Sequence, residues 1–327
     1  MPIAMVHERG IDYKDTRWKG LDFAKGGHKL ASSLGLSQYR LKMLQGSQLN
    51  KIIKISAAGR DLIAKISPHW YAGSLRRESW CYSKLRKRTN LRLSEVQLYL
   101  GPRNDAFPGH EVLVVDYVPG RVLTNSDFRF PEVNKKVAKV YKEMHKIGMR
   151  GFGFLGGDFS GVHSTWMGFL HDIENATIVM RAGYVRPSFY RWLYVELKRL
   201  PTPDKQCLLY GDFSPKNLIL SDGGIVPIDF QNCFSGDGLY DLGIGVSRVR
   251  EILPHLSYYS CSGVGMKEMR MILLYAIRDA LTIISHKATV GDLFSIAEQK
   301  RKIVELERLY NQNQPFLTKK SRNKPLI

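Results

Sequence analysis

The amino-acid sequence predicts an α+β protein of two lobes, a small N-terminal lobe built on an antiparallel sheet and a larger, mainly helical C-terminal lobe. Three observations support this prediction. The chain has 327 residues, and single hydrophobic cores usually divide beyond about 250 to 300 residues. Short β-rich runs separated by turn signals dominate residues 39–66. Segments with helical spacing of apolar side chains dominate the chain after residue 130.

In the N-terminal lobe, residues 39–66 read as strands separated by two turns, Gln45-Gly46-Ser47 and Ala58-Gly59-Arg60. Apolar and aromatic side chains among charges predict a partly buried helix over residues 75–88. Residues 95–101 and 111–118 read as two further strands. The first thirty residues are interpreted as a leading segment without an assigned element.

The sequence changes character after Pro119-Gly120, where we expect the boundary between the lobes. The predicted organisation is residues 1–118 for the N-terminal lobe with its leading segment, 119–316 for the C-terminal lobe, and 317–327 for a basic tail. Helical spacing predicts four helices in the larger lobe, over residues 131–148, 189–200, 266–286 and 294–310. Between them, residues 207–243 form a compact strand-and-loop segment.

Composition narrows the functional classes. Hydrophobic residues make up 44% and charged residues 24%, close to the averages for folded soluble proteins, which excludes wholesale disorder. The start of the chain lacks the apolar run of a signal peptide, and no stretch reaches the ~20 apolar residues that span a bilayer. We therefore expect a cytoplasmic protein. The four cysteines are widely spaced without a Cys-x-x-Cys pair, which argues against a disulfide framework or a zinc site.

The net charge is unusual, because 49 Lys and Arg against 30 Asp and Glu leave +19. Such an excess attracts nucleic acid, anionic membrane or an acidic substrate, without indicating a fold. A cluster of basic residues around the helix at 75–88 motivates a nucleic-acid-binding hypothesis, but no known nucleic-acid motif accompanies it. A solvated basic face is the simpler interpretation, and peripheral contact with an anionic membrane is a further partner class that the charge allows.

The residues that indicate chemistry lie within 207–243. Apolar runs there bracket two polar loops, one with Asp212 and Asn217 and the other with Asp229. Phosphoryl transfer from a nucleotide needs such a set, since its transition state requires positioning and charge neutralisation. Magnesium prefers oxygen ligands, commonly one or two carboxylates with phosphates and water. Asp229 and Asn217 can supply that site and leave Asp212 to accept the hydroxyl proton.

The same segment resembles the catalytic core of the aminoglycoside phosphotransferase and choline kinase family, whose members have a protein-kinase-like fold. That family carries H-G-D-x-x-x-x-N, then I-D-[FW], then G-D-x-x-x-D-L. This chain has the corresponding residues in the same order and at matching separation: Tyr210-Gly211-Asp212, Asn217, Ile228-Asp229-Phe230, Gly236-Asp237 and Asp241-Leu242. The resemblance covers about residues 40–245.

The resemblance implies that Asp212 is the catalytic base and that Asn217 and Asp229 bind magnesium. It also implies that Asp237 and Asp241 brace the catalytic loop. The chain departs from the family at Tyr210, where the family usually has His, and a hydrogen-bonding aromatic side chain could fill that structural role. The competing interpretation is that these Asp and Asn residues are ordinary turn residues.

The resemblance further predicts an ATP site in the N-terminal lobe. Lys65 ends a segment that resembles the kinase V-A-I-K strand, and Glu78 follows in the predicted helix as its ion-pair partner. The alternative is a solvated lysine and a surface glutamate. Gly46 and Ser47 occupy the turn that this family places over the nucleotide phosphates, although a plain hairpin explains the same residues.

Two other positions have expected roles. Asp116 and Val118 lie in the segment that resembles the hinge of the family, where backbone groups hold adenine. His145 ends a helix where the family often has Leu-His, and we expect it to be a packing residue rather than a ligand.

The leading hypothesis is an ATP- and magnesium-dependent kinase that acts on a hydroxyl of a small molecule. A protein substrate is disfavoured because no long activation segment with an A-P-E motif follows Asp229. An inactive kinase-like binding module is the non-enzymatic alternative, and the joint retention of Lys65, Asp212, Asn217 and Asp229 argues against it.

The acceptor is expected to be neutral or anionic, with a sugar or a lipid-linked sugar as candidates, and an aminoglycoside-type antibiotic is the alternative. Polycationic ligands need pockets rich in carboxylates. The region after Asp241 instead has more cations than acids. The cations are Arg248, Arg250, Lys267, Arg270, Arg278 and Lys287, against Glu251, Glu268, Asp279 and Asp292.

Overall fold

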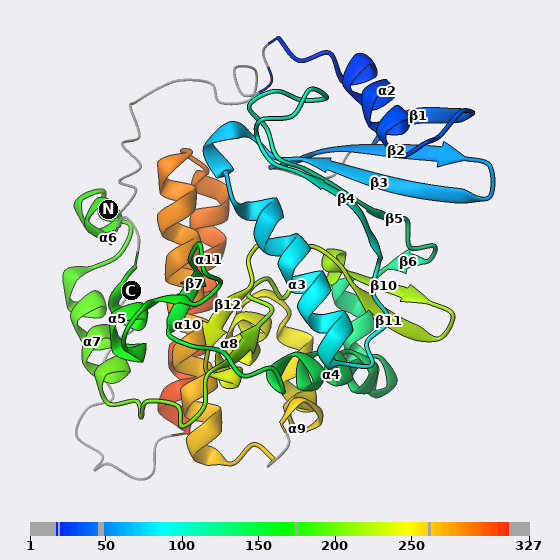
Figure 1. Cartoon of the computed structure of the whole chain (residues 1–327). Helices are drawn as coiled ribbons and strands as arrows, with labels where there is room; N and C mark the ends of the chain where they lie inside the picture. Colours follow the sequence, from blue (N-terminus) through cyan, green and yellow to red (C-terminus); the bar gives the residue numbers. More distant parts are fainter. Residues whose placement is uncertain (1–17, 19, 45–48, 174–175, 261–262, 314–327) are drawn as a thin grey trace, which may run out of the picture. The chain divides into compact units, whose positions relative to one another are not determined.

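The computed structural model describes residue 18 and residues 20–44, 49–173, 176–260 and 263–313 (Figure 1). The chain divides into two compact units. The first comprises Met1–Gly120 with Ile228–Gln231, and the second comprises Arg121–Pro227 with Asn232–Ile327. The predicted tail at 317–327 lies outside the described residues. No helix in the described ranges is long and apolar enough to cross a membrane.

The first unit contains one antiparallel sheet with strand order β1-β2-β3-β5-β4. This confirms the predicted small sheet lobe and its helix over residues 75–88, although the lobe was expected to have one helix and has a second one over residues 23–33. Its strands are β1 (Tyr39–Leu44), β2 (Lys51–Ala57), β3 (Arg60–Ile66), β4 (Val96–Leu100) and β5 (Val112–Asp116), and its helices are α2 (Phe23–Ser33), the short η1 (His69–Tyr71) and α3 (Ser74–Arg88).

The two faces of β3 have different roles because side chains alternate along a strand. Leu62, Ala64 and Ile66 are buried in a core with Leu30 of α2 and with Phe107. The intervening Lys65 therefore belongs to the opposite face. The sheet thus separates a dry core on one face from a buried lysine on the other.

Helix α2 was not predicted, because residues 23–33 were interpreted as part of a leading segment. Two adjacent glycines in its middle lower the intrinsic helix propensity by about 1 kcal/mol each relative to Ala. Packing explains them: an added Cβ would lie 2.4 Å from the Phe107 ring at Gly26 and 2.6 Å from Leu41 at Gly27. The glycines allow α2 to approach its neighbours closely, so tertiary packing outweighs local propensity.

The second unit is mainly helical, as predicted. Its helices are η2 (Asn125–Arg129), α4 (Pro131–His145), α5 (Trp166–His171), α6 (Ala176–Arg181), α7 (Pro187–Lys198), η3 (Pro215–Asn217), α8 (Gly238–Arg248), η4 (Arg250–His255), α9 (Leu256–Tyr259), α10 (Met266–Thr289) and α11 (Leu293–Gln312). Its strands are β6 (Arg121–Val122), β7 (Phe152–Leu155), β8 (Gly161–His163), β9 (Cys207–Leu209), β10 (Leu218–Ser221), β11 (Gly224–Pro227) and β12 (Phe234–Gly236).

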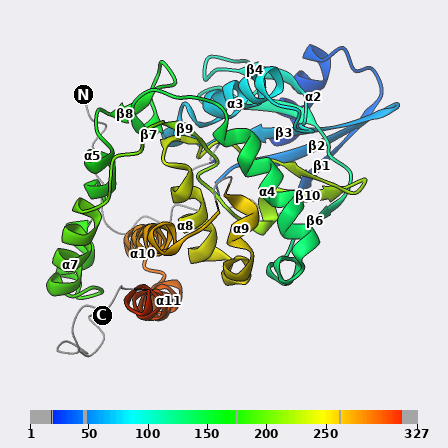
Figure 2. The same cartoon turned by 90° about the horizontal axis from the view of Figure 1, so that it is seen from below.

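These strands form two small antiparallel sheets, β11-β10-β6 and β8-β7-β12-β9. The four predicted helices correspond to α4, α7, α10 and α11. Helix α8 was not predicted, since its three glycines disguise the helical pattern. It packs along α10, which also packs along α11, and Figure 2 shows the three together. Helix α10 is buried over much of its length and forms the centre of this unit.

Candidate active site

In the first unit, the sheet and α3 bring Lys65, Glu78 and Asp229 together. The Nζ atom of Lys65 lies 2.7 Å from Oε1 of Glu78 and 3.2 Å from Oδ1 of Asp229. Lys65 is 7% exposed and Glu78 is fully buried. The predicted ion pair is therefore a buried one, and the alternative of a solvated lysine and a surface glutamate is wrong.

Burial and neighbouring charges shift the pKa values of Lys65 and Glu78 in opposite directions. Burial lowers the pKa of Lys65, but the charges of Asp229 and Glu78 raise it further, so the net shift is upward. Burial raises the pKa of Glu78, which the Lys65 charge opposes. Lys65 therefore remains a cation, held between two carboxylates.

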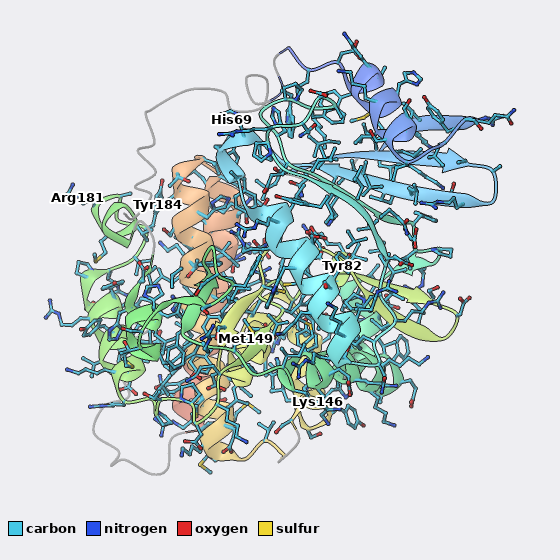
Figure 3. All side chains as sticks on the ribbon, in the orientation of Figure 1. His69, Tyr82, Lys146, Met149, Arg181 and Tyr184 are labelled. Carbon is cyan, nitrogen blue, oxygen red and sulfur yellow. The ribbon has the colours of Figure 1, made fainter. Side chains whose placement is uncertain are left out.

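The segment Ile228–Gln231 belongs to the first unit through several side chains. Tyr82, labelled on α3 in Figure 3, is one of them. Its ring packs edge-on against that of Phe230, with ring centroids 4.8 Å apart. Asn50 donates to Oε1 of Gln231 at 3.0 Å. Asp229 has φ of +66°, a left-handed conformation uncommon for a residue other than glycine. These contacts hold the Asp229 carboxylate beside Lys65.

In the second unit, the loop between β9 and β10 carries Asp212. Gly211 precedes it with φ of +73°, and an added Cβ would lie 2.1 Å from the carbonyl oxygen of Asn232. Only glycine fits this position, for both conformational and steric reasons. The buried Tyr210 hydroxyl donates to the Asn217 carbonyl at 3.0 Å, so it links the two ends of the loop. The Tyr at the usual His position thus has the structural role expected of it.

Asp241 braces this loop, as the resemblance implies. Its buried carboxylate accepts from the backbone N–H groups of Tyr210 at 2.8 Å and of Gly211 at 2.9 Å. His145 Nε2 lies 2.9 Å from the same carboxylate, so His145 packs against the brace.

Asp237, the second residue expected to brace the loop, contacts the start of α8. It caps α8 by accepting from the Leu239 N–H at 3.0 Å, and it accepts from the Tyr275 hydroxyl at 2.9 Å. Burial raises its pKa. These two contacts place its contribution at the start of α8, the helix that also carries Asp241.

Both carboxylate oxygens of Asp212 are engaged. Oδ2 accepts from Asn217 Nδ2 at 3.1 Å and from Asn232 Nδ2 at 3.5 Å. Oδ1 accepts from Nη1 of Arg248, the last residue of α8. The Asp212 side chain is 15% exposed and that of Arg248 is 28% exposed, so both can be reached from solvent.

Two further predicted site residues, Asp116 and Val118, lie apart from the Lys65–Glu78 ion pair in the hydrogen-bond network. Asp116 ends β5 and accepts from Gln97 Nε2 at 3.0 Å, and Val118 is half-buried. Within the described chain, no hydrogen bond or ion pair connects either residue to Lys65 or Glu78. Gly46 and Ser47 lie outside the described residues.

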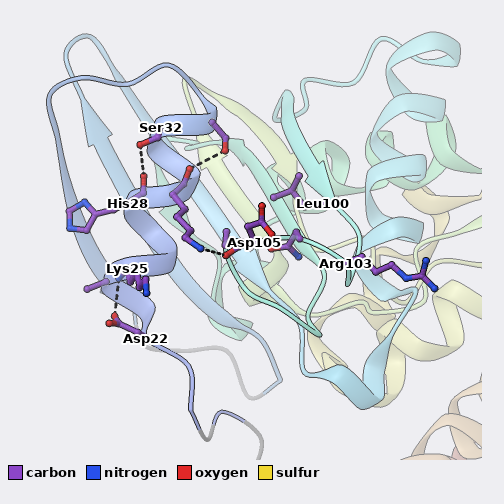
Figure 4. Close-up of a pocket in the computed structure, with 12 residues that line it drawn as sticks. Asp22, Lys25, His28, Ser32, Leu100, Arg103 and Asp105 are labelled. Atoms are coloured by element: carbon purple, nitrogen blue, oxygen red, sulfur yellow. Dashed lines mark hydrogen bonds between the residues drawn. The ribbon is translucent and has the colours of Figure 1, made fainter.

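A surface cavity of about 990 Å³ lies elsewhere in the first unit, between α2 and the turn after β4 (Figure 4). Lys25 and Lys29 line it from the helix, and Arg103 and Asp105 line it from the turn. Lys29 donates to the Asp105 carbonyl at 2.7 Å. None of the predicted site residues lines this cavity.

The donor atoms suit magnesium. Asn217 of the second unit uses its amide nitrogen on Asp212, and Asp229 of the first unit uses one carboxylate oxygen on Lys65, so each has another side-chain oxygen. Carboxylate and amide oxygens are what Mg²⁺ takes together with phosphates and water. In the described ranges, no cluster of three or more His, Cys, Asp or Glu side chains is placed to hold a metal ion.

Comparison with known proteins identifies the family. A family model described as "Phosphotransferase enzyme family" matches residues 41–263. The chain belongs to this phosphotransferase family. The phosphotransferase is therefore an enzyme that transfers a phosphoryl group to a hydroxyl of a small molecule. No curated protein matches the chain.

Solved structures resemble the phosphotransferase in fold. A thermostable mutant of aminoglycoside phosphotransferase APH(4)-Ia, in ternary complex with AMP-PNP and hygromycin B, has TM-score 0.69 and 17% identity, over 86% of this chain and 97% of that chain. A candidate fructosamine-3-kinase from Haemophilus somnus has TM-score 0.58 and 17% identity, over 87% and 97%. A GDP complex of aminoglycoside 2'-phosphotransferase-IIIa has TM-score 0.63 and 14% identity, over 90% and 100%. These TM-scores show that the fold is shared, which is the kinase-like phosphotransferase fold.

Sequence reasoning did not assign Asn232 or Arg248 of the phosphotransferase to the site. The position of Arg248 could have been predicted from its spacing in the sequence. It lies seven residues after Asp241, and seven residues are nearly two helical turns, so both residues share one face of α8. The helix was not predicted, and this spacing was therefore missed.

Proposed function

We propose that this phosphotransferase moves the γ-phosphate of ATP, with Mg²⁺, to a hydroxyl of a neutral or anionic small molecule. A sugar or a lipid-linked sugar is our candidate acceptor. The observation that carries the proposal is the environment of Asp212. It lies in a loop braced by Asp241, and its carboxylate is already paired with the guanidinium of Arg248.

We propose residues 1–118 as the nucleotide-binding lobe. Lys65 contacts the ATP phosphates, and its buried pairing with Glu78 supports this role, since a lysine fixed by a carboxylate presents its charge at a defined place. Gly46 and Ser47 belong to the loop over the phosphates. Backbone groups near Asp116 and Val118 hold adenine.

We propose residues 119–316 as the catalytic and acceptor-binding lobe, with Asp212 as the base. Asp212 accepts the proton of the acceptor hydroxyl as its oxygen attacks the γ-phosphorus, and ADP leaves. Asn217 and Asp229 are the proposed magnesium ligands. When bound, Mg²⁺ neutralises charge on the transferring phosphates. Asn217 also orients Asp212 through its amide nitrogen.

Three of the four acids named after Asp241 have local partners, and this supports a neutral or anionic acceptor. Asp279 forms an ion pair with the Arg248 guanidinium. Glu268 caps α10 by accepting from the Gly265 N–H, and Asp292 caps α11 by accepting from the Ser295 N–H. A polycation would need such carboxylates to be available. The complex of a fold relative with hygromycin B keeps an aminoglycoside as the second candidate.

An acceptor panel with γ-labelled ATP tests the proposal. Sugars, sugar phosphates and aminoglycosides are compared with and without Mg²⁺. We expect Mg²⁺-dependent labelling of a sugar or sugar phosphate, whereas exclusive labelling of aminoglycosides would contradict our choice of acceptor. Nucleotide binding without turnover would favour the inactive module, and binding of nucleic acid that weakens steeply with salt would favour the third hypothesis. An ATP-dependent reaction and the buried free thiols of Cys81, Cys207 and Cys233 agree with the cytoplasm as the proposed compartment.

A further inference from the structure

The six Lys and Arg residues after Asp241 that were expected to favour an anionic acceptor have different surroundings. Five contact neither Asp212 nor Asn217 in the described part of the chain. Arg250 pairs with Glu305 at 2.6 Å, Lys287 pairs with Asp292 at 3.1 Å, Arg270 donates to the Tyr310 hydroxyl at 2.8 Å, Arg278 is buried against backbone carbonyls, and Lys267 is exposed. Arg248 alone among the six reaches the carboxylate of Asp212.

The position of Arg248 is fixed from a second side. Its Nε atom lies 3.4 Å from Oδ2 of Asp279 in α10, and its Nη2 atom lies 3.5 Å from Oδ1. The hydroxyl of the preceding Ser247 donates to the same carboxylate. Helices α8 and α10 pack along one another, so Asp279 anchors the guanidinium in place (Figure 2). Arg248 is thus held on a rigid helix pair.

The guanidinium has unused binding capacity. Arginine has five N–H donors, and three contacts are made, one each by Nε, Nη1 and Nη2. Two donors therefore remain for another ligand in the described structure. The side chain is 28% exposed, which is enough for a small oxyanion to reach it. Paired guanidinium N–H groups bind phosphate and carboxylate with two parallel hydrogen bonds.

From this geometry we infer that Arg248 is a specificity-determining residue of the acceptor site. It binds an oxyanion, a phosphate or a carboxylate, that the acceptor carries near the hydroxyl to be phosphorylated. This inference rests on the proposed function, since it takes Asp212 as the base. The oxyanion occupies the two remaining donors, while Asp279 keeps the guanidinium in place beside Asp212.

The same residue disfavours polycationic acceptors. A cationic amino group that approaches Asp212 meets a carboxylate already paired with a cation, and the guanidinium repels it. A polycationic acceptor therefore finds the Asp212 carboxylate already engaged by Arg248.

A binding experiment on the full chain tests the inference without requiring turnover. Protein labelled with ¹⁵N-arginine and saturated with Mg²⁺ and AMP-PNP is titrated with inorganic phosphate and, separately, with acetate. The Arg248 Nε–H signal is identified by its loss in Arg248→Lys. We expect a saturable shift of that signal, and the comparison of the two titrations shows which oxyanion is preferred. Arg250, exposed and paired with Glu305, is the matched control. Absence of a saturable shift, or an equal shift at Arg250, would overturn the inference.

A kinetic arm separates this inference from the proposed function. The ratio of kcat/KM for a sugar phosphate to that for the parent sugar is measured in wild type, Arg248→Lys, Arg248→Gln and Arg250→Gln. We expect Arg248→Gln to lower the ratio about tenfold or more, Arg248→Lys to lower it less, and Arg250→Gln to leave it unchanged. An unchanged ratio in Arg248→Gln with active enzyme contradicts the inference alone. Failure of wild type to phosphorylate any acceptor, while phosphate still shifts the Arg248 signal, contradicts the proposed function alone.

Discussion

The carboxylate of Asp241 accepts the backbone N–H of Tyr210 at 2.8 Å, and no part of Asp241 is exposed. Hydrogen bonds to charged groups contribute about 1.5 to 3 kcal/mol each. We therefore expect Asp241→Asn to lower the free energy of unfolding by about 2 to 4 kcal/mol and to reduce kcat, because the loop of Asp212 loses its brace. Urea denaturation and turnover measure the two effects.

Asp237→Asn is the matched control for Asp241. It disturbs the cap of α8, which is typically worth about 1 kcal/mol, and leaves the brace in place. The two variants should differ clearly in kcat once both are measured in the folded state. Equal losses of kcat would show that Asp241 acts only through global stability.

Asp212→Asn should remove most turnover while nucleotide binding persists. The substitution keeps the volume and one acceptor oxygen but removes the proton-accepting carboxylate, and positioned bases typically contribute about 10²- to 10⁴-fold. Steady-state kcat with a verified acceptor is the measurement. The exposed Asp204→Asn serves as control. Turnover of Asp212→Asn near that of wild type would mean that another group is the base.

Replacing Asp229 or Lys65 should weaken binding of Mg²⁺-ATP. Asp229→Ala removes a proposed metal ligand, and Lys65→Ala removes the proposed phosphate contact. Calorimetric titration of Mg²⁺-ATP gives both affinities, with the exposed Lys42→Ala as control. Lys65→Ala also leaves Glu78 buried without its cation, so its fold must be verified by circular dichroism. Unchanged affinities in both folded variants would refute the nucleotide-site assignment.

Arg278 is expected to be a stability residue. It is 3% exposed and donates to the carbonyls of Leu170 at 2.8 Å and Phe169 at 2.7 Å, at the end of α5. Lysine lacks the guanidinium fork, so Arg278→Lys should lower the free energy of unfolding by about 3 kcal/mol. Chemical denaturation measures the loss. Arg250→Lys should change stability by less than about 1 kcal/mol, and equal losses would refute this role.

His110 should make stability depend on pH. Burial lowers its pKa below the ordinary value of 6.5, and the nearby His69 acts in the same direction. The unfolded chain therefore binds the proton more readily than the folded protein does. The contribution of neutral His110 to the free energy of unfolding is complete above pH 6.5 and is lost as pH falls through the lower pKa of the folded state. The free energy of unfolding measured from pH 8 to pH 5 should decline, and His110→Asn should decline less steeply. Parallel curves would refute the assignment.

The sequence was most informative where periodicity and motif spacing agree. The strands 39–66, helix α3 and the four long helices follow from apolar spacing, and Asp212 and Asn217 follow from a motif whose spacing is set by a tight loop. Helices α2 and α8 could not be predicted because glycines at their packing surfaces lower local propensity. The Arg248 contact depends on α8 and on Asp279 in a different helix, so no local pattern could reveal it.

The assignment of Ile228–Gln231 to the first unit has a consequence for biosynthesis. Lys65 and Asp229 are separated by 164 residues in the chain. At about 5 to 20 residues per second, a ribosome needs on the order of ten seconds or more to make the intervening segment. During that time the nascent sheet has its lysine without the second carboxylate, without Gln231 for Asn50 and without Phe230 for Tyr82. Most of the first unit leaves the ribosome early, but its contacts are complete only after residues 228–231 have been made. A chain truncated before residue 228 would lack these contacts permanently.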